Sequence, residues 1–366
     1  MHILTLNAGS SSLKFSIYAA KDTRLMLSGS VTFQNGAHVL KSGSTLITLP
    51  QHKDVYETLA FVFDWLEKLG FSARLTCGIG HRIVHGGRIF TQPVVLDQHT
   101  IAQLEGLKRL APLHVPISLD VIAAAKALRP QVLNVGCFDT AFHADQPEVA
   151  SQFALPQTIT AQGYRRYGFH GLNYEHIVSS FAEVTGQLLP RRLLAAHLGS
   201  GASLCAIVGG KSVATTMGFS TADGLTMSSR TGSLDPGVML ALMRDQKLGV
   251  DEMEALLYRR SGLLGLSGLS ADMQTLLAST TAEATFAVAH YCYWAARHAG
   301  SLIMAMGGVD AVVFSGGVGE NSSAIRHGIL AHMTWLNLAD NQVYVIKADE
   351  ERVLARHVSK QLASHC

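Results

Sequence analysis

The sequence predicts an α/β protein made of two related domains, and three observations lead to this fold class. Strand-like runs alternate with helical patterns along the chain, which is typical of sheets covered by helices. The length of 366 residues corresponds to about two domains of roughly 150 residues. A strand–turn–strand pattern near the N-terminus is repeated in the second half of the chain, which favours a duplicated domain.

Most elements have clear signals. Three helices have recognisable ends: one follows a cap at Asp54 and ends at Gly70, one runs from Thr280 to Gly307-Gly308, and the last runs from Asp349 to about Ala363. The predicted strands are His2–Leu6, Leu13–Tyr18, Leu25–Phe33, Val39–Leu49, Leu75–Val84, Val132–Phe138, Leu193–His197, Leu204–Val208 and Ala311–Phe314.

The repeat pairs Leu4–Ile17 with Leu194–Ile207, so that Gly9-Ser10 aligns with Gly199-Ser200, 190 residues later. Each copy consists of a strand, a tight turn of small residues and a second strand. Chance similarity between two hairpins is one explanation. The other is a duplication in which each half presents a hairpin to a phosphate, and an offset of about half the chain favours it.

Composition and charge exclude several classes of protein. Hydrophobic residues make up 48% and charged residues 15%, which is the opposite of the balance found in disordered chains. Lys and Arg total 29 against 27 Asp and Glu, so the chain lacks the basic surplus of nucleic-acid-binding or polybasic membrane-binding proteins. The most apolar long window, Ala299–Gly319, contains Asp310 and several glycines and is a poor membrane span.

Cysteine usage points to a reducing compartment. The five cysteines are odd in number and form no C-x-x-C pair, which argues against a disulfide framework and a zinc cage. The N-terminus enters a strand at once, without a basic or cleavable apolar segment. We therefore expect a soluble protein of the cytoplasm.

Three glycine-rich turns are candidates for phosphate binding. Small residues at Gly9–Ser12 and Gly199–Ala202 let backbone N–H groups approach a phosphate, and Lys14 follows the first turn. A third turn, Ser315–Asn321, follows a strand and precedes a helix, whose N-terminus attracts anions. One such turn is equally well explained by chain geometry, but three favour nucleotide phosphates. None has the spacing of a Walker loop or of a dinucleotide fingerprint.

Four polar residues are candidates for chemistry. Arg82 interrupts an apolar strand, where a guanidinium needs an anion, either a structural carboxylate or a substrate. Asp139 follows another apolar strand and is either a cap or a catalytic group. His170, before Gly171, either donates to an oxyanion or packs, and Arg230 lies in a polar turn of the kind usually found at a surface.

Eight segments together resemble the acetate kinases, a family of short-chain carboxylate kinases that includes propionate kinase. The resemblance runs in the same order from the first residues to Glu350, so it covers nearly the whole chain. The segments are Asn7–Lys14, Gly80–Gly87, Ala111–His114, Phe138–His143, Arg166–Gly171, His197–Ser203, Ser261–Gly268 and Gly316–Ser322.

The resemblance implies a fold and a reaction. The fold is the duplicated actin-like, ribonuclease H-like fold of the acetate and sugar kinase, heat-shock and actin superfamily, with nucleotide in the interdomain cleft. The implied N-terminal domain is 1–143, completed by the C-terminal helix at about 352–366, and the C-terminal domain is 144–351. The implied enzyme is a cytoplasmic homodimer without nucleic-acid or membrane partners. It transfers the γ-phosphoryl group of ATP reversibly to acetate, giving acetyl phosphate and ADP, with Mg²⁺ or alternatively Mn²⁺.

The resemblance also implies roles for individual residues. Arg82 binds the substrate carboxylate, Arg230 the transferring phosphoryl group, His170 stabilises the transition state, His114 lies near the phosphoryl group, and Asp139 takes the acid/base position. The implied metal ligands are Asn7 and Glu350. The implied acyl pocket consists of Val84, Leu113, Phe169 and Thr221. The implied nucleotide contacts are Lys14, His197, Leu198, Gly199, Ser200, Gly201, Asp272, Met273, Gln274, Gly317, Val318, Gly319, Glu320 and Asn321.

The chain departs from the family pattern at several positions. Thr221 replaces the usual proline of the acyl pocket, which leaves the preference between acetate and propionate open. The segment Leu172–Tyr174 reads Leu-Asn-Tyr in place of Thr-Ser-His. Ser200 replaces an asparagine and Gln274 an arginine, and both changes bear on nucleotide affinity.

Two further questions stay open at this stage. The substrate carboxylate is already ionised at neutral pH, so the reaction needs no base to activate it. Asp139 then more plausibly orients metal-bound water or an arginine, whereas the resemblance implies that it is the acid/base residue. The alternatives to acetate kinase are another short-chain carboxylate kinase, a non-catalytic nucleotide sensor and a carboxylate-independent ATPase. A sugar kinase is disfavoured, because it would present an aspartate to a hydroxyl with little positive charge.

Overall fold

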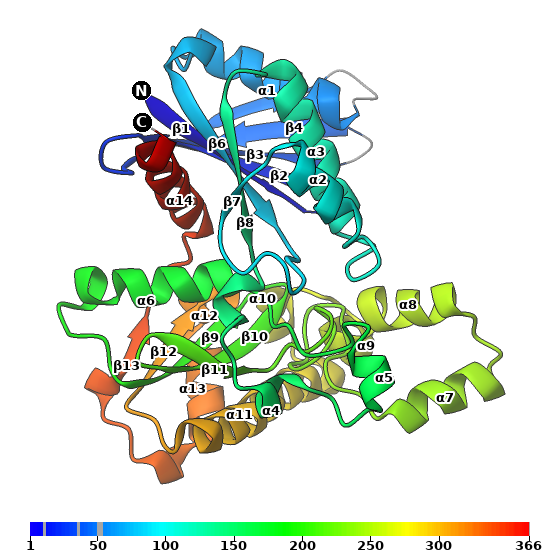
Figure 1. Cartoon of the computed structure of the whole chain (residues 1–366). Helices are drawn as coiled ribbons and strands as arrows, with labels where there is room; N and C mark the ends of the chain where they lie inside the picture. Colours follow the sequence, from blue (N-terminus) through cyan, green and yellow to red (C-terminus); the bar gives the residue numbers. More distant parts are fainter. Residues whose placement is uncertain (10–11, 35–36, 50–53, 366) are drawn as a thin grey trace. The chain divides into compact units, whose positions relative to one another are not determined.

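The computed structural model describes residues 1–9, 12–34, 37–49 and 54–365 and divides into two compact units (Figure 1). Unit 1 consists of Met1–Ala141 and Asp349–Cys366, and unit 2 of Phe142–Ala348. The resemblance implied domain boundaries after residue 143 and at about residue 352. Ser10 and Ser11 of the first predicted phosphate turn, and Cys366, lie outside the described residues.

Unit 1 contains a mixed sheet with the strand order β5-β4-β3-β2-β1-β6-β8-β7. Strands β1 to β5 form an antiparallel meander, whereas β1, β6 and β8 run parallel to one another. The strands are β1 (His2–Ala8), β2 (Ser12–Ala19), β3 (Leu25–Gln34), β4 (Ala37–Ser42), β5 (Thr45–Thr48), β6 (Thr76–Ile83), β7 (Val94–Val95) and β8 (Leu133–Phe138).

Helices cover both faces of this sheet. The helices are α1 (Val55–Lys68), α2 (Gln98–Glu105), α3 (Val115–Leu128) and α14 (Glu350–His365), and a 3₁₀ turn spans 73–75. Apolar residues of α1 and α3 form one core with β1 and β2. Helix α14 packs against β1, β6 and β8 (Figure 1).

Two glycines of β6 make room for α14. A Cβ atom at Gly78 would lie 2.4 Å from Val358 Cγ1, and one at Gly80 would lie 3.1 Å from Leu354 Cβ. Because side chains alternate between the faces of a strand, Arg82 belongs to the same face as these glycines. The close packing of α14 therefore brings the beginning of this helix toward Arg82.

Unit 2 contains a second mixed sheet, with the order β11-β10-β9-β12-β13. Its strands are β9 (Arg192–Leu198), β10 (Ala202–Val208), β11 (Lys211–Thr215), β12 (Ala311–Ser315) and β13 (Val343–Val345). Its helices are α4 (Glu148–Ser151), α5 (Gln157–Thr160), α6 (Gly171–Thr185), α7 (Pro236–Asp245), α8 (Val250–Arg259), α9 (Gly262–Ser267), α10 (Met273–Ala278), α11 (Ala282–Met306), α12 (Gly316–Asn321) and α13 (Ser323–Ala331).

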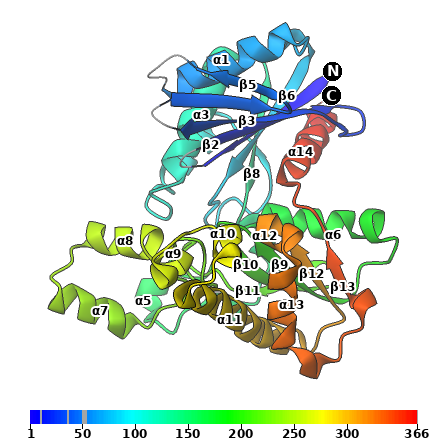
Figure 2. The same cartoon turned by 180° about the vertical axis from the view of Figure 1, so that it is seen from behind.

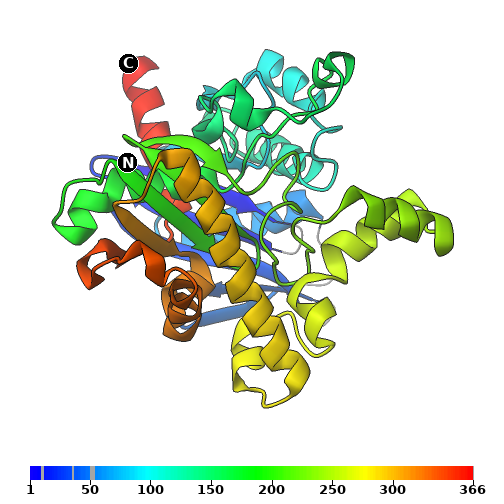
Figure 3. The ribbon, with the colours of Figure 1, turned by 90° about the horizontal axis from the view of Figure 1, so that it is seen from below.

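The sheet of unit 2 is covered on both faces. Helix α6 forms a core with one face through Tyr174, Ile177 and Phe181. The long helix α11 crosses the other face, and α13 packs against α11 (Figures 2 and 3). Helices α7 and α8 lie at one end of the unit, away from the sheet (Figure 2).

The two sheets share one topology, which supports duplication. In unit 1 the order β3-β2-β1-β6-β8 combines a three-stranded antiparallel meander with two parallel strands, and β11-β10-β9-β12-β13 does the same in unit 2. The repeated segments are the equivalent hairpins β1-β2 and β9-β10. The predicted α/β fold is thus confirmed, and the repeat is not a chance similarity.

Several sequence-based boundaries were wrong in detail. The run Val39–Leu49 is a hairpin, β4-β5, because Gly43 adopts a φ of 55° and reverses the chain. The cap of α11 is Thr281, whose side chain accepts from the Ala284 amide, and not Thr280. The glycine-rich segment after β12 is itself helix α12 and not a loop that precedes a helix. The short strands β7, β11 and β13 were not predicted.

Among the described residues, the structure contains no helix that is long and apolar enough to cross a membrane.

The strand β6 also carries a buried histidine that should make unit 1 sensitive to acid. His81 is 2% exposed and bonds the Asn134 side-chain oxygen through Nε2 at 2.7 Å, and burial lowers its pKa to about 4. Because the unfolded chain takes up this proton near pH 6.5, the contribution to stability is complete above that pH and is lost as the pH falls toward 4.

We therefore expect the free energy of unfolding to decrease by about 2 kcal/mol between pH 7 and pH 5 because of His81. Urea denaturation at the two pH values measures this difference. His81→Gln should reduce the difference by that amount, whereas His99→Gln, at an exposed position, should leave it unchanged. An undiminished pH dependence in His81→Gln would contradict the assignment.

Candidate active site

The candidate residues form two groups, one in each unit. In unit 1 the group lies at the carboxyl ends of the neighbouring parallel strands β1, β6 and β8. Asn7 is near the end of β1, Arg82 is near the end of β6, and Asp139 directly follows β8. The parallel arrangement brings these three residues to one edge of the sheet, which is where open α/β sheets bind ligands.

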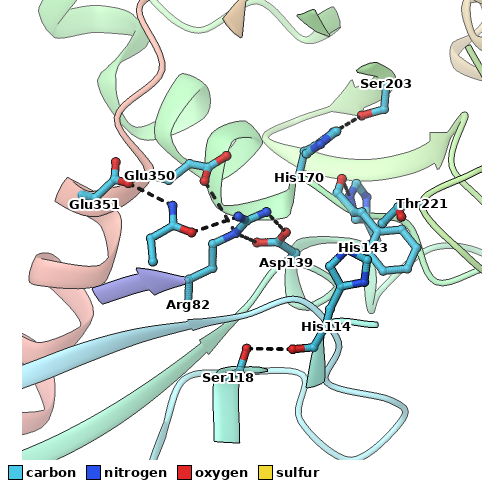
Figure 4. Close-up of polar contacts among 12 residues, drawn as sticks. Arg82, His114, Ser118, Asp139, His143, His170, Ser203, Thr221, Glu350 and Glu351 are labelled. Atoms are coloured by element: carbon cyan, nitrogen blue, oxygen red, sulfur yellow. Dashed lines mark hydrogen bonds and ion pairs between the residues drawn. The ribbon is translucent and has the colours of Figure 1, made fainter. Parts of the chain in front are cut away.

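Arg82 is the centre of the group (Figure 4). Its Nε donates to Asp139 Oδ1 at 3.0 Å and its Nη2 to Asp139 Oδ2 at 2.6 Å, a bidentate pair. Its Nη1 donates to Asn7 Oδ1 at 3.0 Å, and Glu350 Oε2 lies 3.6 Å from Nε. The Asp139 side chain is 1% exposed, whereas that of Arg82 is 19% exposed. The buried carboxylate therefore fixes the guanidinium group, which is still accessible to a ligand.

The guanidinium group of Arg82 has more hydrogen-bond donors than Asp139 and Asn7 use. It has five N–H groups, and three donate to Asp139 and Asn7. Burial alone would lower the pKa of Arg82, but the carboxylates of Asp139 and Glu350 raise it above its ordinary value. The group therefore stays charged, and within the described part of the chain two of its N–H groups are left to bind an anion.

The beginning of α14 adds two carboxyl groups. Burial raises the pKa of Glu350 to about 7, although the charge of Arg82 acts in the opposite direction. Glu351 Oε1 accepts from Asn7 Nδ2 at 2.9 Å. This bond fixes the orientation of the Asn7 amide, so that its oxygen points to Arg82. Lys14, on β2, pairs in register with Asn7 and is exposed.

Glu351 was not identified from the sequence, although it lies beside Glu350. Its partner Asn7 is 344 residues away in the chain, so no local pattern could reveal the bond. The remaining candidates of unit 1 lie on loops: Val84 is buried after β6, Leu113 precedes α3, and His114 is the residue that caps α3, with Ser118 donating to its carbonyl (Figure 4).

In unit 2 the group surrounds the hairpin β9-β10. The turn is closed by Gly199 N donating to Gly201 O at 3.0 Å. A Cβ atom at Gly201 would lie 3.3 Å from His170 Nε2 and 3.5 Å from Arg230 Nη1. The absence of a side chain at Gly201 thus lets an imidazole and a guanidinium approach the backbone of the turn together.

His170 is held in an unusual backbone conformation. It has a φ of 57° and immediately precedes α6, a position that few residues other than glycine adopt. Its ring stacks on that of His197, from β9, with centroids 4.2 Å apart. Its Nδ1 bonds Ser203 Oγ at 2.8 Å (Figure 4).

Arg230 lies on a turn whose backbone is hydrogen-bonded to the beginning of α9. Its Nη1 donates to the carbonyl of the buried residue Thr221 at 3.2 Å. The amides of Ser261, Leu263 and Leu264 donate to the carbonyls of residues 229, 227 and 228, respectively. Gly262 allows this contact, because a Cβ atom there would lie 2.2 Å from Met227 O. The segment Ser261–Gly268 therefore holds the Arg230 turn in place.

The other predicted nucleotide residues lie at two helix ends of unit 2. Gly316, with a φ of 78°, starts α12 directly against the Leu198 carbonyl, so Gly317 lies near the Gly199 turn. Glu320 Oε1 accepts from the Gly316 and Ala348 amides, and Asn321 donates to Gly317 O. Asp272 caps α10, with Met273 buried and Gln274 exposed.

Phe169 is anchored by a further histidine, His143. Because a carbonyl only accepts, His143 Nε2 donates to Phe169 O at 2.9 Å, and Nδ1 bonds Ser212 Oγ. This contact keeps the strained segment before α6 in place. Because both ring nitrogens of His143 have hydrogen-bond partners, this histidine of the segment Phe138–His143 can be buried.

Two residues next to Arg82 fit a magnesium ion. No group of three or more His, Cys, Asp or Glu residues suited to a metal occurs in the described part of the chain. Mg²⁺, however, usually takes only one or two protein oxygen ligands and completes its shell with phosphate and water. The Asn7 amide oxygen and the Glu350 carboxylate, which both contact Arg82, form such a donor set.

The comparison with known proteins decides the family. The sequence profile of the Acetokinase family matches residues 2–364. The chain belongs to this family. It is 43% identical to an acetate kinase of Rhodopseudomonas palustris (strain TIE-1), with 97% of each chain covered.

Solved structures of the family agree with the fold. A propionate kinase from Francisella tularensis superposes with a TM-score of 0.90 at 29% identity and covers 98% of this chain and 99% of its own. The acetate kinase of Porphyromonas gingivalis has a TM-score of 0.90 at 30% identity, with 99% of each chain covered. The duplicated two-sheet architecture predicted from the sequence is therefore that of the acetokinase family.

Proposed function

We propose that the protein is an acetate kinase, which transfers the γ-phosphoryl group of ATP to the carboxylate of acetate. The proposal rests on membership of the acetokinase family, on the names of its relatives and on one feature of unit 1. That feature is Arg82, whose pairing with Asp139 and Asn7 leaves two N–H groups for a small carboxylate. In the reaction an acetate oxygen forms a bond to the γ-phosphorus, the bond to the ADP oxygen breaks, and acetyl phosphate and ADP result.

The chemical difficulty is the approach of two anions. Acetate is ionised at neutral pH and needs no base, whereas the γ-phosphoryl group carries negative charge on its peripheral oxygens. Arg82 neutralises and orients the carboxylate, because a guanidinium group matches its two oxygens. Arg230 and His170 donate to the phosphoryl oxygens above the Gly201 turn, and His114 lies near that group. The resemblance assigns Val84, Leu113, Phe169 and Thr221 to the pocket for the methyl group.

The nucleotide and the metal complete the proposal. Backbone N–H groups of the segment His197–Gly201 and of Gly317–Asn321 cradle the phosphates, with Lys14 as a further cation. Asp272–Gln274 border the nucleoside. Asn7 and Glu350 hold Mg²⁺, or Mn²⁺ in its place, which when bound supplies positive charge to the phosphate oxygens.

The proposed role of Asp139 is to position Arg82. We expect Asp139→Asn to reduce kcat/KM for acetate by about 100-fold, because an amide presents one acceptor where the guanidinium group needs two. The shape of the pH–rate profile should be unchanged. Steady-state kinetics between pH 6 and 9 measures both, and Asp54→Asn, a helix cap in which asparagine serves equally well, is the control. Loss of the acidic limb in Asp139→Asn would show instead that Asp139 is a base.

One assay tests the function against its alternatives. The protein is incubated with ATP, Mg²⁺ and a panel of short carboxylates, and acyl phosphate is trapped with hydroxylamine while ADP is measured. Acetate-dependent ADP release with trapped product supports the proposal, whereas preference for propionate assigns the second candidate, which Thr221 leaves open and for which a propionate kinase of similar structure is known. Carboxylate-independent ADP release would indicate an ATPase, and nucleotide binding without turnover would indicate a sensor.

The proposed assembly is a homodimer formed through unit 2. Helix α7 has no buried residue, and it exposes Val238, Leu240 and Met243, while Val250 at the start of α8 is 75% exposed. A face of this kind favours a protein partner, and for a family enzyme we propose a second copy.

We expect Leu240→Glu to convert the dimer to a monomer in analytical ultracentrifugation. Met304→Glu, which changes a 75% exposed residue of α11, serves as the control. An unaltered dimer would place the interface elsewhere.

We place the reaction in the cytoplasm, where ATP is abundant and thiols are reduced. Four cysteines of the described chain, Cys77, Cys137, Cys205 and Cys292, form no disulfide bond. Reduced thiols are typical of proteins in that compartment.

A further inference from the structure

His170, Ser203 and Tyr174 form a buried chain of hydrogen bonds in unit 2. Ser203 Oγ lies 2.8 Å from His170 Nδ1 and 2.5 Å from the Tyr174 hydroxyl oxygen. Tyr174 follows His170 by one turn of α6, which brings the two side chains to the same side of the helix. Tyr174 stands where the acetate-kinase motif ordinarily has a histidine, so this chain of bonds depends on a departure of the present sequence.

The direction of these bonds follows from counting hydrogens. The Tyr174 hydroxyl is fully buried, and burial raises its pKa well above the ordinary value, so it keeps its hydrogen. The backbone amide of His197 also acts on the phenol oxygen as a donor. In the described part of the chain, Ser203 Oγ is the acceptor to which the Tyr174 hydroxyl group can donate its hydrogen. Ser203 then has one hydrogen of its own, and its other partner is His170 Nδ1.

The opposite direction is unfavourable. If His170 Nδ1 carried a hydrogen and donated to Ser203, Ser203 would either donate to Tyr174 or accept from both partners, since a hydroxyl oxygen has two lone pairs. In the first case the Tyr174 hydrogen and in the second case the Ser203 hydrogen would be buried without an acceptor among the described residues, which costs about 1–3 kcal/mol. The network therefore favours Nδ1 as an acceptor.

We propose that Tyr174 is a positioning residue that acts through Ser203 to keep the proton of neutral His170 on Nε2. Nε2 is the ring nitrogen that faces the Gly201 turn, 3.3 Å from the point where a Cβ atom of Gly201 would lie. Arg230 Nη1 lies 3.5 Å from the same point. Two donors, Nε2–H and the guanidinium group, thus converge where the proposed function requires the phosphoryl group to be stabilised, and the inference rests on that function for its catalytic meaning.

The stacked ring of His197 is consistent with an uncharged His170. The two imidazoles are 4.2 Å apart, with planes inclined by 23°. A positive charge on both rings at this distance would be repulsive. A neutral ring with a fixed tautomer donates a hydrogen bond from Nε2 without this repulsion.

The first test is spectroscopic and does not depend on activity. Nitrogen NMR of the full-length protein with ¹⁵N-labelled histidine, assigned with His170→Gln, distinguishes a protonated from an unprotonated Nδ1 by chemical shift and by one-bond coupling to hydrogen. We expect an unprotonated Nδ1 and a protonated Nε2 in His170 near neutral pH. A protonated Nδ1 in the unmodified protein would overturn the proposal, even if the protein proved to be an active acetate kinase.

The second test removes the relay. Tyr174→Phe keeps the ring and deletes the hydroxyl group, after which Ser203 is free to accept from Nδ1. We expect mixed tautomers of His170, a decrease of kcat by about 10-fold and little change in KM for acetate or ATP. Tyr291→Phe is the matched control, because Tyr291 is buried in α11 and its hydroxyl group has no partner in the described structure. Parent-like NMR signals and kcat in Tyr174→Phe would contradict the relay, whereas an inactive parent protein with the expected tautomer would contradict only the proposed function.

Discussion

Replacing Arg82 by lysine should reduce kcat/KM for acetate by about 100-fold, with a higher KM and a lower kcat. An ammonium group keeps the charge but loses the planar fork that holds both oxygens of Asp139 and reaches Asn7. The remaining cation would sit closer to Asp139 and present fewer directed donors to the substrate. Steady-state kinetics with varied acetate at saturating ATP measures both parameters.

Arg129→Lys provides the control for Arg82→Lys. Arg129 also pairs with a carboxylate of unit 1, Glu67, at 2.6 Å, but this ion pair is partly exposed and is remote from the strand ends that carry the candidate site. Kinetic constants like those of the parent protein in Arg82→Lys would rule out direct contact between Arg82 and the carboxylate.

Replacing Arg230 by glutamine should lower kcat by about 100- to 1,000-fold and change KM for acetate little. Arg230 contacts the protein through the Thr221 carbonyl, and α9 fixes its turn through backbone bonds that do not involve its side chain. Loss of the guanidinium group should therefore spare the fold and remove charge stabilisation from the transition state. Rapid-quench measurement of phosphoryl transfer at saturating substrates separates this effect from product release.

Arg191→Gln is the matched control in unit 2, because Arg191 is exposed just before β9. It should have the same kcat as the parent protein. If Arg230→Gln raised KM for acetate and left kcat unchanged, Arg230 would be a binding residue and its assignment to the phosphoryl group would be wrong.

Local signals in the sequence singled out Arg82 and Asp139 as candidates, and the resemblance to the family implied roles for both of them. Arg82 lies in an apolar strand and Asp139 follows another, and the structure shows that these strands, β6 and β8, are parallel neighbours whose carboxyl ends lie together. The repeat identified β1-β2 and β9-β10 as equivalent hairpins, and the sheet orders agree with it. The sequence alone also raised the possibility that Asp139 organises an arginine, and the bidentate pair with Arg82 shows that arginine.

The sequence could not predict contacts that depend on distant segments. The bond between Asn7 and Glu351 joins residues at opposite ends of the chain, and the link from His170 to Tyr174 passes through Ser203 on another element. Short strands such as β7 have too few residues for a periodic signal. The glycine-rich segment after β12 was expected as a turn because glycine disfavours helices, but its packing against Leu198 stabilises α12.

The use of α14 to complete unit 1 has a consequence for biosynthesis. The ribosome makes the eight strands of that unit first and then the entire second unit before it reaches Asp349. Until then Gly78 and Gly80 lack the helix that packs on them, and Arg82 lacks Glu350. A nascent chain therefore cannot assemble the acidic cluster around Arg82 before all of unit 2 and the beginning of α14 have been made.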